Sequence, residues 1–287
     1  MKKTVILILT IVLIISSLTA CKTQNDFDNG KITIAVSIPP QSEFVKAVCG
    51  DKVNLITMLP TGASPETYEP TVKDMKDLEF ADIYFSIGVP MEENSIIPSL
   101  TKNTENVKLH ESVAKLYPEL FEGEHSHRDP HIWLSLKRAV VMVEEICETV
   151  CKKDSKNAEE YRKNADLYIQ KLNNLNSEIE TLFKNKESKI FIVYHPAFAY
   201  FADEYSLSMY ALEEHGKEVT AKHLAEMIDF AKKENIKTVF YSEENSTKLP
   251  LTFANEIGGN AIKLYPLAEN YLENMKTMAL NIAKAMK

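Results

Sequence analysis

The stretch from Ser155 to Asn185, SKNAEEYRKNADLYIQKLNNLNSEIETLFKN, decides how the rest of the chain can be arranged. Its apolar residues recur at alternating spacings of three and four, at Ala158, Tyr161, Ala165, Tyr168, Leu172, Leu175, Ile179 and Leu182. This period predicts one long amphipathic helix. At 1.5 Å per residue the helix would span on the order of 45 Å, which exceeds the width of one small lobe. The helix therefore either joins two lobes as a strut or, because its apolar seam is narrow, pairs with a second copy as a coiled coil.

Strand and helix patterns alternate on both sides of this helix. Strands are expected at 31–37, 53–58, 83–87, 107–110, 189–193, 207–212, 238–241 and 260–264, and helices at 41–49, 71–80, 93–100, 136–152, 197–204, 220–234, 247–257 and from Tyr271. Such alternation predicts an α/β fold with two lobes, each with a mostly parallel helix-covered sheet, joined by a long rigid backbone helix. The position of the long helix between two such regions favours the strut. We expect an N-terminal lobe at 31–154, a linking helix at 155–187 and a C-terminal lobe at 188–287.

The first 30 residues predict export and anchoring. Two lysines precede an apolar run at 5–15, and Leu18-Thr19-Ala20-Cys21 follows it, which is the layout of a signal peptide over residues 1–20. A retained membrane helix is the weaker alternative, because a span needs about 20 apolar residues. The four residues ending in Cys21 also resemble the bacterial lipobox, so we expect Cys21 to carry lipid rather than to remain an unmodified secreted cysteine. Residues 21–30 then form a polar, lipid-anchored tether.

Charge and cysteine content narrow the possible functions. Removal of residues 1–20 takes two of the 33 basic residues and leaves 31 against 41 acidic ones, a net charge of −10 with histidine neutral. Nucleic acid is therefore not an expected partner. Cys49, Cys147 and Cys151 are an odd number, which argues against a disulfide-stapled scaffold. Cys147 and Cys151 lie four apart on one predicted helix, where we favour buried small side chains over a redox or metal pair.

The loops that follow strands carry the candidate metal ligands. Open α/β sheets bind ligands beyond the carboxyl ends of their strands. The candidates in and around such loops are, in chain order, Glu66, His131, His195, Glu243 and Glu244. Each has an ordinary alternative, because loop carboxylates are usually solvated and single histidines usually make structural hydrogen bonds. The sequence has no CxxC pair, and the candidate residues are far apart along the chain, so a metal site would have to be assembled from distant loops.

Four ordered motifs resemble one known family. The lipobox-like segment is followed by GASPETYEPT at 62–71, DPHIWL at 129–134 and YHPAFAYFA at 194–202. Together they resemble the metal-specific solute-binding proteins of ABC importers, the zinc and manganese receptors, and the resemblance covers nearly the whole chain. It implies two lobes around a rigid helical backbone, one buried metal ion between them, and delivery of that ion to a permease with a cytoplasmic ATPase.

The resemblance also suggests the ligands. His131 and His195 match the family's ligands in the second and third motifs. Many relatives have histidine where this chain has Glu66, and since a carboxylate also binds zinc, Glu66 is expected to replace it. The fourth family ligand is a Glu or Asp in the last ligand loop, where we prefer Glu243 with Glu244 as the alternative.

A short histidine pair and the ligand types bear on the metal. The segment EGEHSHRD at 122–129 resembles the His-rich loops of zinc receptors, so His125 and His127 are an accessory metal-capture loop or an ordinary solvated loop. Two imidazoles and two carboxylates also suit Mn²⁺ or Fe²⁺, but intrinsic affinity favours Zn²⁺. Binding is expected to weaken below about pH 6, where imidazoles become protonated.

Two other functional classes fit the sequence less well. A zinc hydrolase would need an open coordination position and a general base, and no HExxH or nucleophile arrangement accompanies His131 and His195. A surface adhesin would not require the ordered ligand motifs. We therefore expect a monomeric, extracytoplasmic, lipid-anchored metal receptor rather than an enzyme.

Overall fold

The computed structural model describes residues 27, 29–122, 127–213, 219–244 and 247–286. The chain divides into two compact units, Met1–Lys31 and Ile32–Lys287, and the fold below is that of the second unit. Cys21, the signal peptide at 1–20 and His125 lie outside the described residues, so those interpretations stay predictions. Within the described ranges, no helix combines the length and the apolar character needed to cross a membrane.

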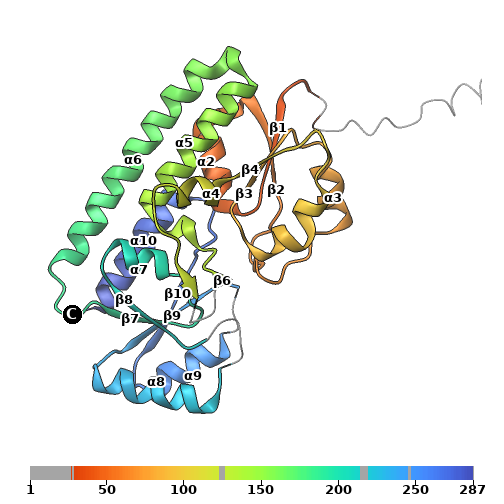
Figure 1. Cartoon of the computed structure of the whole chain (residues 1–287). Helices are drawn as coiled ribbons and strands as arrows, with labels where there is room; N and C mark the ends of the chain where they lie inside the picture. The colour runs from red at the N-terminus through yellow and green to blue at the C-terminus, as the bar shows by residue number, and fades with distance from the viewer. Residues whose placement is uncertain (1–26, 28, 123–126, 214–218, 245–246, 287) are drawn as a thin grey trace, which may run out of the picture. The chain divides into compact units, whose positions relative to one another are not determined.

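The N-terminal sheet has four parallel strands in the order β2-β1-β3-β4 (Figure 1). Its strands are β1 (Ile32–Val36), β2 (Val53–Thr57), β3 (Ile83–Ser86) and β4 (Glu105–Lys108), and the helices of this region are α2 (Pro39–Cys49), α3 (Val72–Leu78), α4 (Leu109–Ala114) and α5 (Leu136–Lys153). Pro39 and Pro40 do not merely end the first strand. They open α2, because the first helical positions need no N–H donor.

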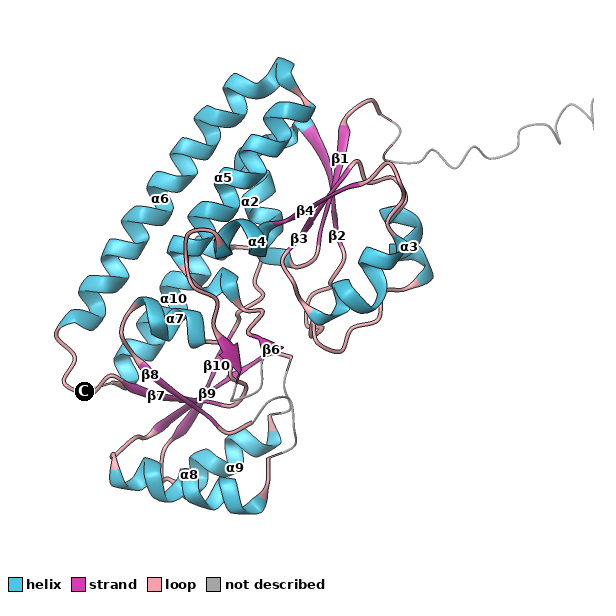
Figure 2. Cartoon of the chain, viewed as in Figure 1, coloured by secondary structure: helices cyan, strands magenta, loops and turns pink. Residues whose placement is uncertain are grey.

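The C-terminal sheet repeats this design, with four parallel strands in the order β10-β9-β7-β8. Its strands are β7 (Ile190–Val193), β8 (Ser208–Ala211), β9 (Thr238–Ser242) and β10 (Asn260–Leu264), and its helices are α7 (Ala199–Glu204), α8 (Ala221–Lys233), α9 (Lys248–Glu256) and α10 (Tyr271–Ala285). Helices α8 and α9 lie together on one side of the sheet (Figure 2). The predicted fold class is thus confirmed, while the bounds of the two lobes stay a prediction.

The long helix α6 (Ala158–Lys184) packs against α2, α5 and α10. Its buried seam follows the predicted positions as far as Ile179, after which Phe183 is buried and Leu182 is only partly so. This shift is expected because a straight helix drifts relative to a 3.5-residue repeat. Helices of the same chain cover the seam, which agrees with the strut interpretation rather than with the coiled coil.

A second connection between the two sheets runs through residues 265–270. The Trp133 indole Nε1 donates a hydrogen bond to the Pro266 carbonyl at 2.9 Å, and the Tyr271 hydroxyl donates to the Trp133 carbonyl at 2.6 Å. The Glu43 carboxylate on α2 accepts from the Tyr168 hydroxyl on α6 at 2.6 Å and from the Tyr271 backbone N–H. The start of α10 is therefore bound to both the N-terminal region and the long helix.

Three local elements differ from the sequence prediction. The helix expected at 93–100 is a π-helical segment, Glu92–Ile96, followed by a 3-10 turn, Ile97–Ser99. The strand expected at 107–110 ends at Lys108, and His110 lies in the short helix α4. A small antiparallel hairpin, β5 (Phe121–Glu122) with β6 (His127–Arg128), also escaped prediction. Two-residue strands are too short to show a periodic pattern.

The three cysteines of the described region are free and buried. The Cys147 and Cys151 sulfurs lie 3.9 Å apart. Burial and the neighbouring thiols raise the pKa of Cys49 and of Cys147 to about 12. The thiols of Cys49 and Cys147 therefore stay protonated at neutral pH. The burial of both Cys147 and Cys151 agrees with their interpretation as small core side chains.

A buried carboxyl group closes the carboxyl end of the N-terminal sheet. Glu92 is fully buried and accepts hydrogen bonds from the backbone N–H groups of Ile87, at 2.8 Å, and Gly88, at 2.6 Å, and from the Ser37 hydroxyl. Burial outweighs these hydrogen bonds and raises the pKa of Glu92 to about 7. Glu92 thereby fixes the loop that follows β3.

Candidate metal centre

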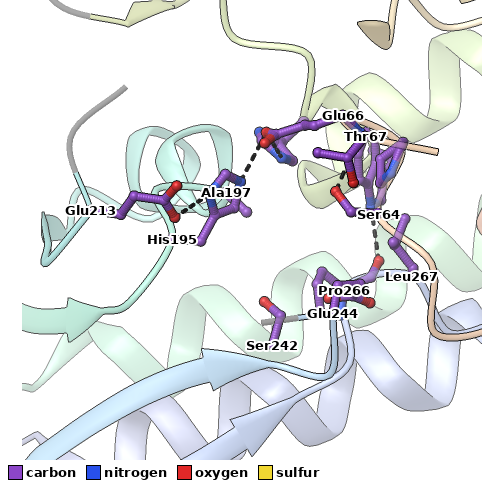
Figure 3. A pocket seen from close by; sticks show the side chains of 13 residues that line it. Ser64, Glu66, Thr67, His195, Ala197, Glu213, Ser242, Glu244, Pro266 and Leu267 are labelled. Atoms are coloured by element: carbon purple, nitrogen blue, oxygen red, sulfur yellow. Dashed lines mark hydrogen bonds and ion pairs between the residues drawn. The ribbon is translucent and has the colours of Figure 1, made fainter. Parts of the chain in front are cut away.

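Glu66, His131 and His195 converge in one pocket. One potential ligand atom from each lies within 4.8 Å of the others. The nearest Glu66 oxygen is 3.1 Å from His195 Nε2 and 4.0 Å from His131 Nε2, and the two imidazole rings are 5.3 Å apart between centroids. Figure 3 shows Glu66 and His195 facing each other across the pocket. Residues from three distant parts of the chain thus present two imidazole nitrogens and one carboxylate to a common point.

Glu66 is held by a tight turn in the loop after β2. The Ser64 carbonyl accepts hydrogen bonds from the backbone N–H groups of Thr67, at 3.2 Å, and Tyr68, at 2.9 Å. The Pro65 carbonyl also accepts from the Met91 N–H at 3.1 Å, which ties the loop to the segment after β3. The turn-rich composition of this segment therefore gives a fixed position for the carboxylate rather than a solvated loop.

His131 is oriented by its own loop. Asp129 Oδ1 accepts from the His131 backbone N–H and also contacts its ring nitrogen Nδ1, both at 2.8 Å. Because an ionised carboxylate only accepts hydrogen bonds, the Nδ1 carries the proton and Nε2 presents its lone pair to the pocket. Both side chains are buried, His131 at 4% and Asp129 at 1% exposure, so this orientation is shielded from competing water.

The segment that carries His131 makes hydrogen bonds to the loop after β3 and to helix α7. Arg128 Nη2 donates to the Gly88 carbonyl after β3 at 2.7 Å. The Leu120 N–H donates to the hydroxyl of Tyr200 on α7 at 3.0 Å. These contacts join the segment that carries His131 both to the loop after β3 and to α7.

His195 follows β7 by two residues, as predicted. The Tyr194 N–H donates to the Phe240 carbonyl of β9 at 2.7 Å, so the chain leaves the sheet in a defined direction. The ring is oriented by Glu213, whose Oε2 lies 3.0 Å from Nδ1. As at His131, a carboxylate on Nδ1 leaves Nε2 facing the pocket (Figure 3).

Two carboxylates therefore flank His195 and set the protonation of the pocket. Burial lowers the pKa of His195, but the hydrogen bonds and charges of Glu213 and Glu66 outweigh it and raise the pKa to about 10. Burial raises the pKa of Glu66, yet the hydrogen bond from His195 and the nearby imidazoles bring it below its ordinary value. In the absence of a metal, a proton on His195 is thus stabilised where the cation would otherwise lie.

The pocket is larger than one ion requires. Its volume is about 210 Å³, and besides the three converging residues its walls include Trp133, Glu213, Ser242, Glu244, Pro266 and Leu267. A single water molecule occupies roughly 30 Å³ in the liquid, so the pocket has room for an ion and several waters. A fourth ligand can therefore come from protein or from solvent.

The two candidates for the fourth carboxylate lie in different surroundings. Glu243, the preferred residue, is exposed and does not line the pocket, whereas the alternative Glu244 does. Burial and the charge of Glu243 raise the pKa of Glu244. Among the described residues, the group whose ligand atoms lie within 4.8 Å of one another consists of Glu66, His131 and His195 and does not include Glu244.

The proposed accessory histidines, His125 and His127, do not belong to the described wall of the pocket. His127 is exposed in β6 and does not line the pocket, and His125 lies outside the described residues. The capture loop remains a prediction.

Sequence reasoning did not assign roles to the two orienting carboxylates. Asp129 lay inside a motif that we quoted, but only its histidine was considered. Glu213 directly follows a predicted strand, so the rule that identified His195 would also have found it. Its pairing with His195 depends on which strands are neighbours, which the sequence does not reveal.

Comparisons with known proteins agree with this geometry. The family model described as zinc-uptake complex component A, periplasmic, matches residues 34–285. The zinc-binding lipoprotein AdcA of Streptococcus pneumoniae strain R6 is 31% identical over 285 residues, covering 90% of this chain and 56% of the relative. The high-affinity zinc uptake system protein ZnuA of Bacillus subtilis strain 168 is 31% identical over 247 residues, covering 81% of this chain and 77% of that protein.

A solved structure from the same family has a similar fold. A crystal structure of ZnuA superposes with a TM-score of 0.83 and 31% identity, covering 90% of this chain and all of that one. The chain spans only 56–58% of the length of the AdcA proteins that it matches.

Proposed function

Because the chain belongs to the family of periplasmic zinc-uptake components, we propose that it captures one divalent transition-metal ion outside the cytoplasm and delivers it to a membrane importer. The resemblance drawn from the sequence motifs is thereby confirmed. The observation that carries the proposal is the convergence of Glu66, His131 and His195 with both Nε2 atoms facing the pocket. The family is one of transport components, and we propose no catalytic activity.

The ligand spacing suits a tetrahedral ion. Zinc binds nitrogen and oxygen at 2.0–2.2 Å, so two ligand atoms in a tetrahedral site lie about 3.3 Å apart. The distances from Glu66 to the two histidines, 3.1 and 4.0 Å, bracket this value. A small adjustment therefore suffices to bring the three side chains onto one ion, with Glu244 or a water molecule as the fourth ligand.

Zinc is the proposed cargo, with Mn²⁺ and Fe²⁺ as alternatives. Two imidazoles with carboxylate oxygen form a site that all three ions accept, and the intrinsic affinity order places zinc above iron and manganese. The names of two relatives, which refer to zinc binding and zinc uptake, support zinc as the cargo. Competitive loading of the purified protein with equal zinc, manganese and iron, followed by elemental analysis, tests it directly.

The proposed partners follow from the importer role. We propose that a permease with a cytoplasmic ATPase receives the ion, that the protein acts as a monomer, and that lipid on Cys21 holds it at the outer face of the cell membrane. The lipoprotein name of an AdcA relative supports the anchor. Metabolic labelling with a radioactive fatty acid, in the natural protein and in Cys21→Ala, tests the lipid attachment.

Metal titration tests the site itself. The single tryptophan, Trp133, lines the pocket with its ring 5.2 Å from that of His131, so its fluorescence is expected to report binding. The natural protein is expected to bind one zinc, and the double variant His131→Ala, His195→Ala to lose nearly all affinity. His223→Ala is the matched control, because His223 lies outside the pocket wall. Zinc binding by the double variant at the affinity of the control would refute the assignment.

A further inference from the structure

We propose that Glu213 is a positioning residue that keeps the proton of neutral His195 on Nδ1 and so leaves Nε2 free to bind the ion. The inference rests on the proposed function, because it concerns a ligand of that site. It goes beyond the ligand set, since Glu213 acts through His195 and is assigned no contact with the metal.

Strand pairing fixes Glu213 beside His195. Strands β7 and β8 are parallel neighbours, with Val193 paired to Ala211. The pairing continues beyond both strands through the Leu212 N–H to the Val193 carbonyl at 2.9 Å, and the Glu213 N–H to the Tyr194 carbonyl at 2.8 Å. The backbone of Glu213 is thus bonded to the residue that precedes His195. Its carboxylate is only 15% exposed and lies 3.0 Å from His195 Nδ1.

The arrangement sets two carboxylates in competition for one proton. Neutral imidazole has a single N–H, and it can point toward Glu213 from Nδ1 or toward Glu66 from Nε2, which are 3.0 and 3.1 Å away. If Nε2 holds the proton, its lone pair is lost and the metal cannot bind there. A hydrogen bond to Glu213 stabilises the other tautomer, in which Nε2 is a ligand and the Glu66 oxygen is also free for the ion.

Glu213 is separable from the ligand loop, unlike its counterpart at His131. Asp129 lies two residues from His131 and also accepts its backbone N–H, so its replacement would disturb the loop as well as the ring. Glu213 follows a neighbouring strand, and within the described ranges its side chain hydrogen-bonds to the His195 ring. Its substitution therefore isolates the effect on the imidazole.

Zinc affinity in three variants tests the inference. Glu213→Leu removes the acceptor and, once each affinity is corrected from its pH dependence for the proton that competes for His195, is expected to weaken zinc binding about 10- to 100-fold, the usual effect of losing such an orienting group. Glu213→Gln keeps a carbonyl oxygen as acceptor and is expected to recover most of that loss. Glu226→Gln, which removes a charge from an exposed position on α8, is the control and should bind like the natural protein. The inference would be overturned if Glu213→Leu bound zinc as tightly as the control, or if Glu213→Gln bound zinc as weakly as Glu213→Leu.

A spectroscopic measurement covers the case in which Glu213→Leu does not fold. Nitrogen-15 spectra of the histidine rings in the natural protein, loaded with zinc alone, distinguish a protonated Nδ1 from a metal-bound one. We expect His195 to show a protonated Nδ1 and a metal-bound Nε2, and the reverse assignment refutes the inference. Failure of the metal site itself is recognised separately, because His195→Ala would then bind zinc normally.

Discussion

Zinc binding is predicted to release a proton from His195, and zinc affinity is predicted to rise about tenfold per pH unit across the neutral range. Glu213 and Glu66 raise the pKa of His195 to about 10 in the metal-free protein. The imidazole is therefore protonated at every pH below that value, whereas the bound ion needs it neutral. At pH 7, removal of this proton costs about 4 kcal/mol, from three pH units at roughly 1.4 kcal/mol each.

The direction of the effect follows from the two pKa shifts. As the pH rises toward 10, the competing proton is held less tightly and zinc binds more strongly. Glu66 does not contribute in this range, because its pKa lies below the ordinary value and its carboxylate is already charged. The sequence alone suggested weakening only below about pH 6. The two carboxylates beside His195 extend the predicted weakening through neutral pH.

Calorimetry measures this proton directly. Zinc is titrated into the metal-free protein at pH 7 in buffers of different ionisation enthalpy, and the slope of the apparent enthalpy against that value counts the protons released. We expect a count near one from His195, and affinities measured with a competing chelator at pH 6.5, 7.5 and 8.5 should differ about tenfold per step. An affinity that does not change with pH, together with no dependence on the buffer, would refute the reasoning.

Three further predictions concern selectivity and stability. Glu66→His replaces a carboxylate by a softer imidazole and should shift zinc-to-manganese selectivity roughly tenfold toward zinc in competitive loading; an unchanged ratio would contradict a ligand role. Gly88→Ala should lower the free energy of urea unfolding by about 1–3 kcal/mol more than Gly62→Ala. Both glycines have positive φ, but only at Gly88 would a Cβ meet Arg128, at 1.7 Å from Nη2, while Gly62 has open space. Finally, Glu92 has a raised pKa, so it should reduce the stability of the metal-free protein by up to about 3 kcal/mol as the pH rises from 4.5 to 7. Urea unfolding at both pH values should show this difference in the natural protein and a smaller one in Glu92→Gln.

Apolar patterns predicted the architecture because the regular elements bury most of their apolar residues. Strands β1, β3, β7 and β9 appear at short apolar runs that are buried on both faces, and the long helix appears where apolar residues recur with spacings of three and four. Elements without such a pattern escaped, namely the short helix α4 and the two-residue strands of the hairpin. Apolar spacing cannot identify segments whose positions depend on tertiary hydrogen bonds, such as the one from Arg128 to Gly88.

The candidate site was predictable to the extent that it depends on strand ends. His195 and Glu66 follow strands, and their motifs singled them out before any geometry was known. The choice between Glu243 and Glu244 depends on the direction in which the chain leaves β9, which the sequence does not specify. The role of Glu213 depends on β8 lying next to β7, a neighbour relation that only the folded sheet reveals.

The two connections between the sheets, the helix α6 and the segment at 265–270, have a mechanical consequence for delivery of the ion. A scaffold joined at two places resists wide opening. Metal–ligand distances, however, lie within about 0.2 Å of their preferred values. A tilt that moves His195 away from His131 further than the side chains can follow would therefore weaken binding of the ion. Under the proposed function, contact with an importer would need to cause only a small tilt of this kind, so the ion could be released without a large hinge motion.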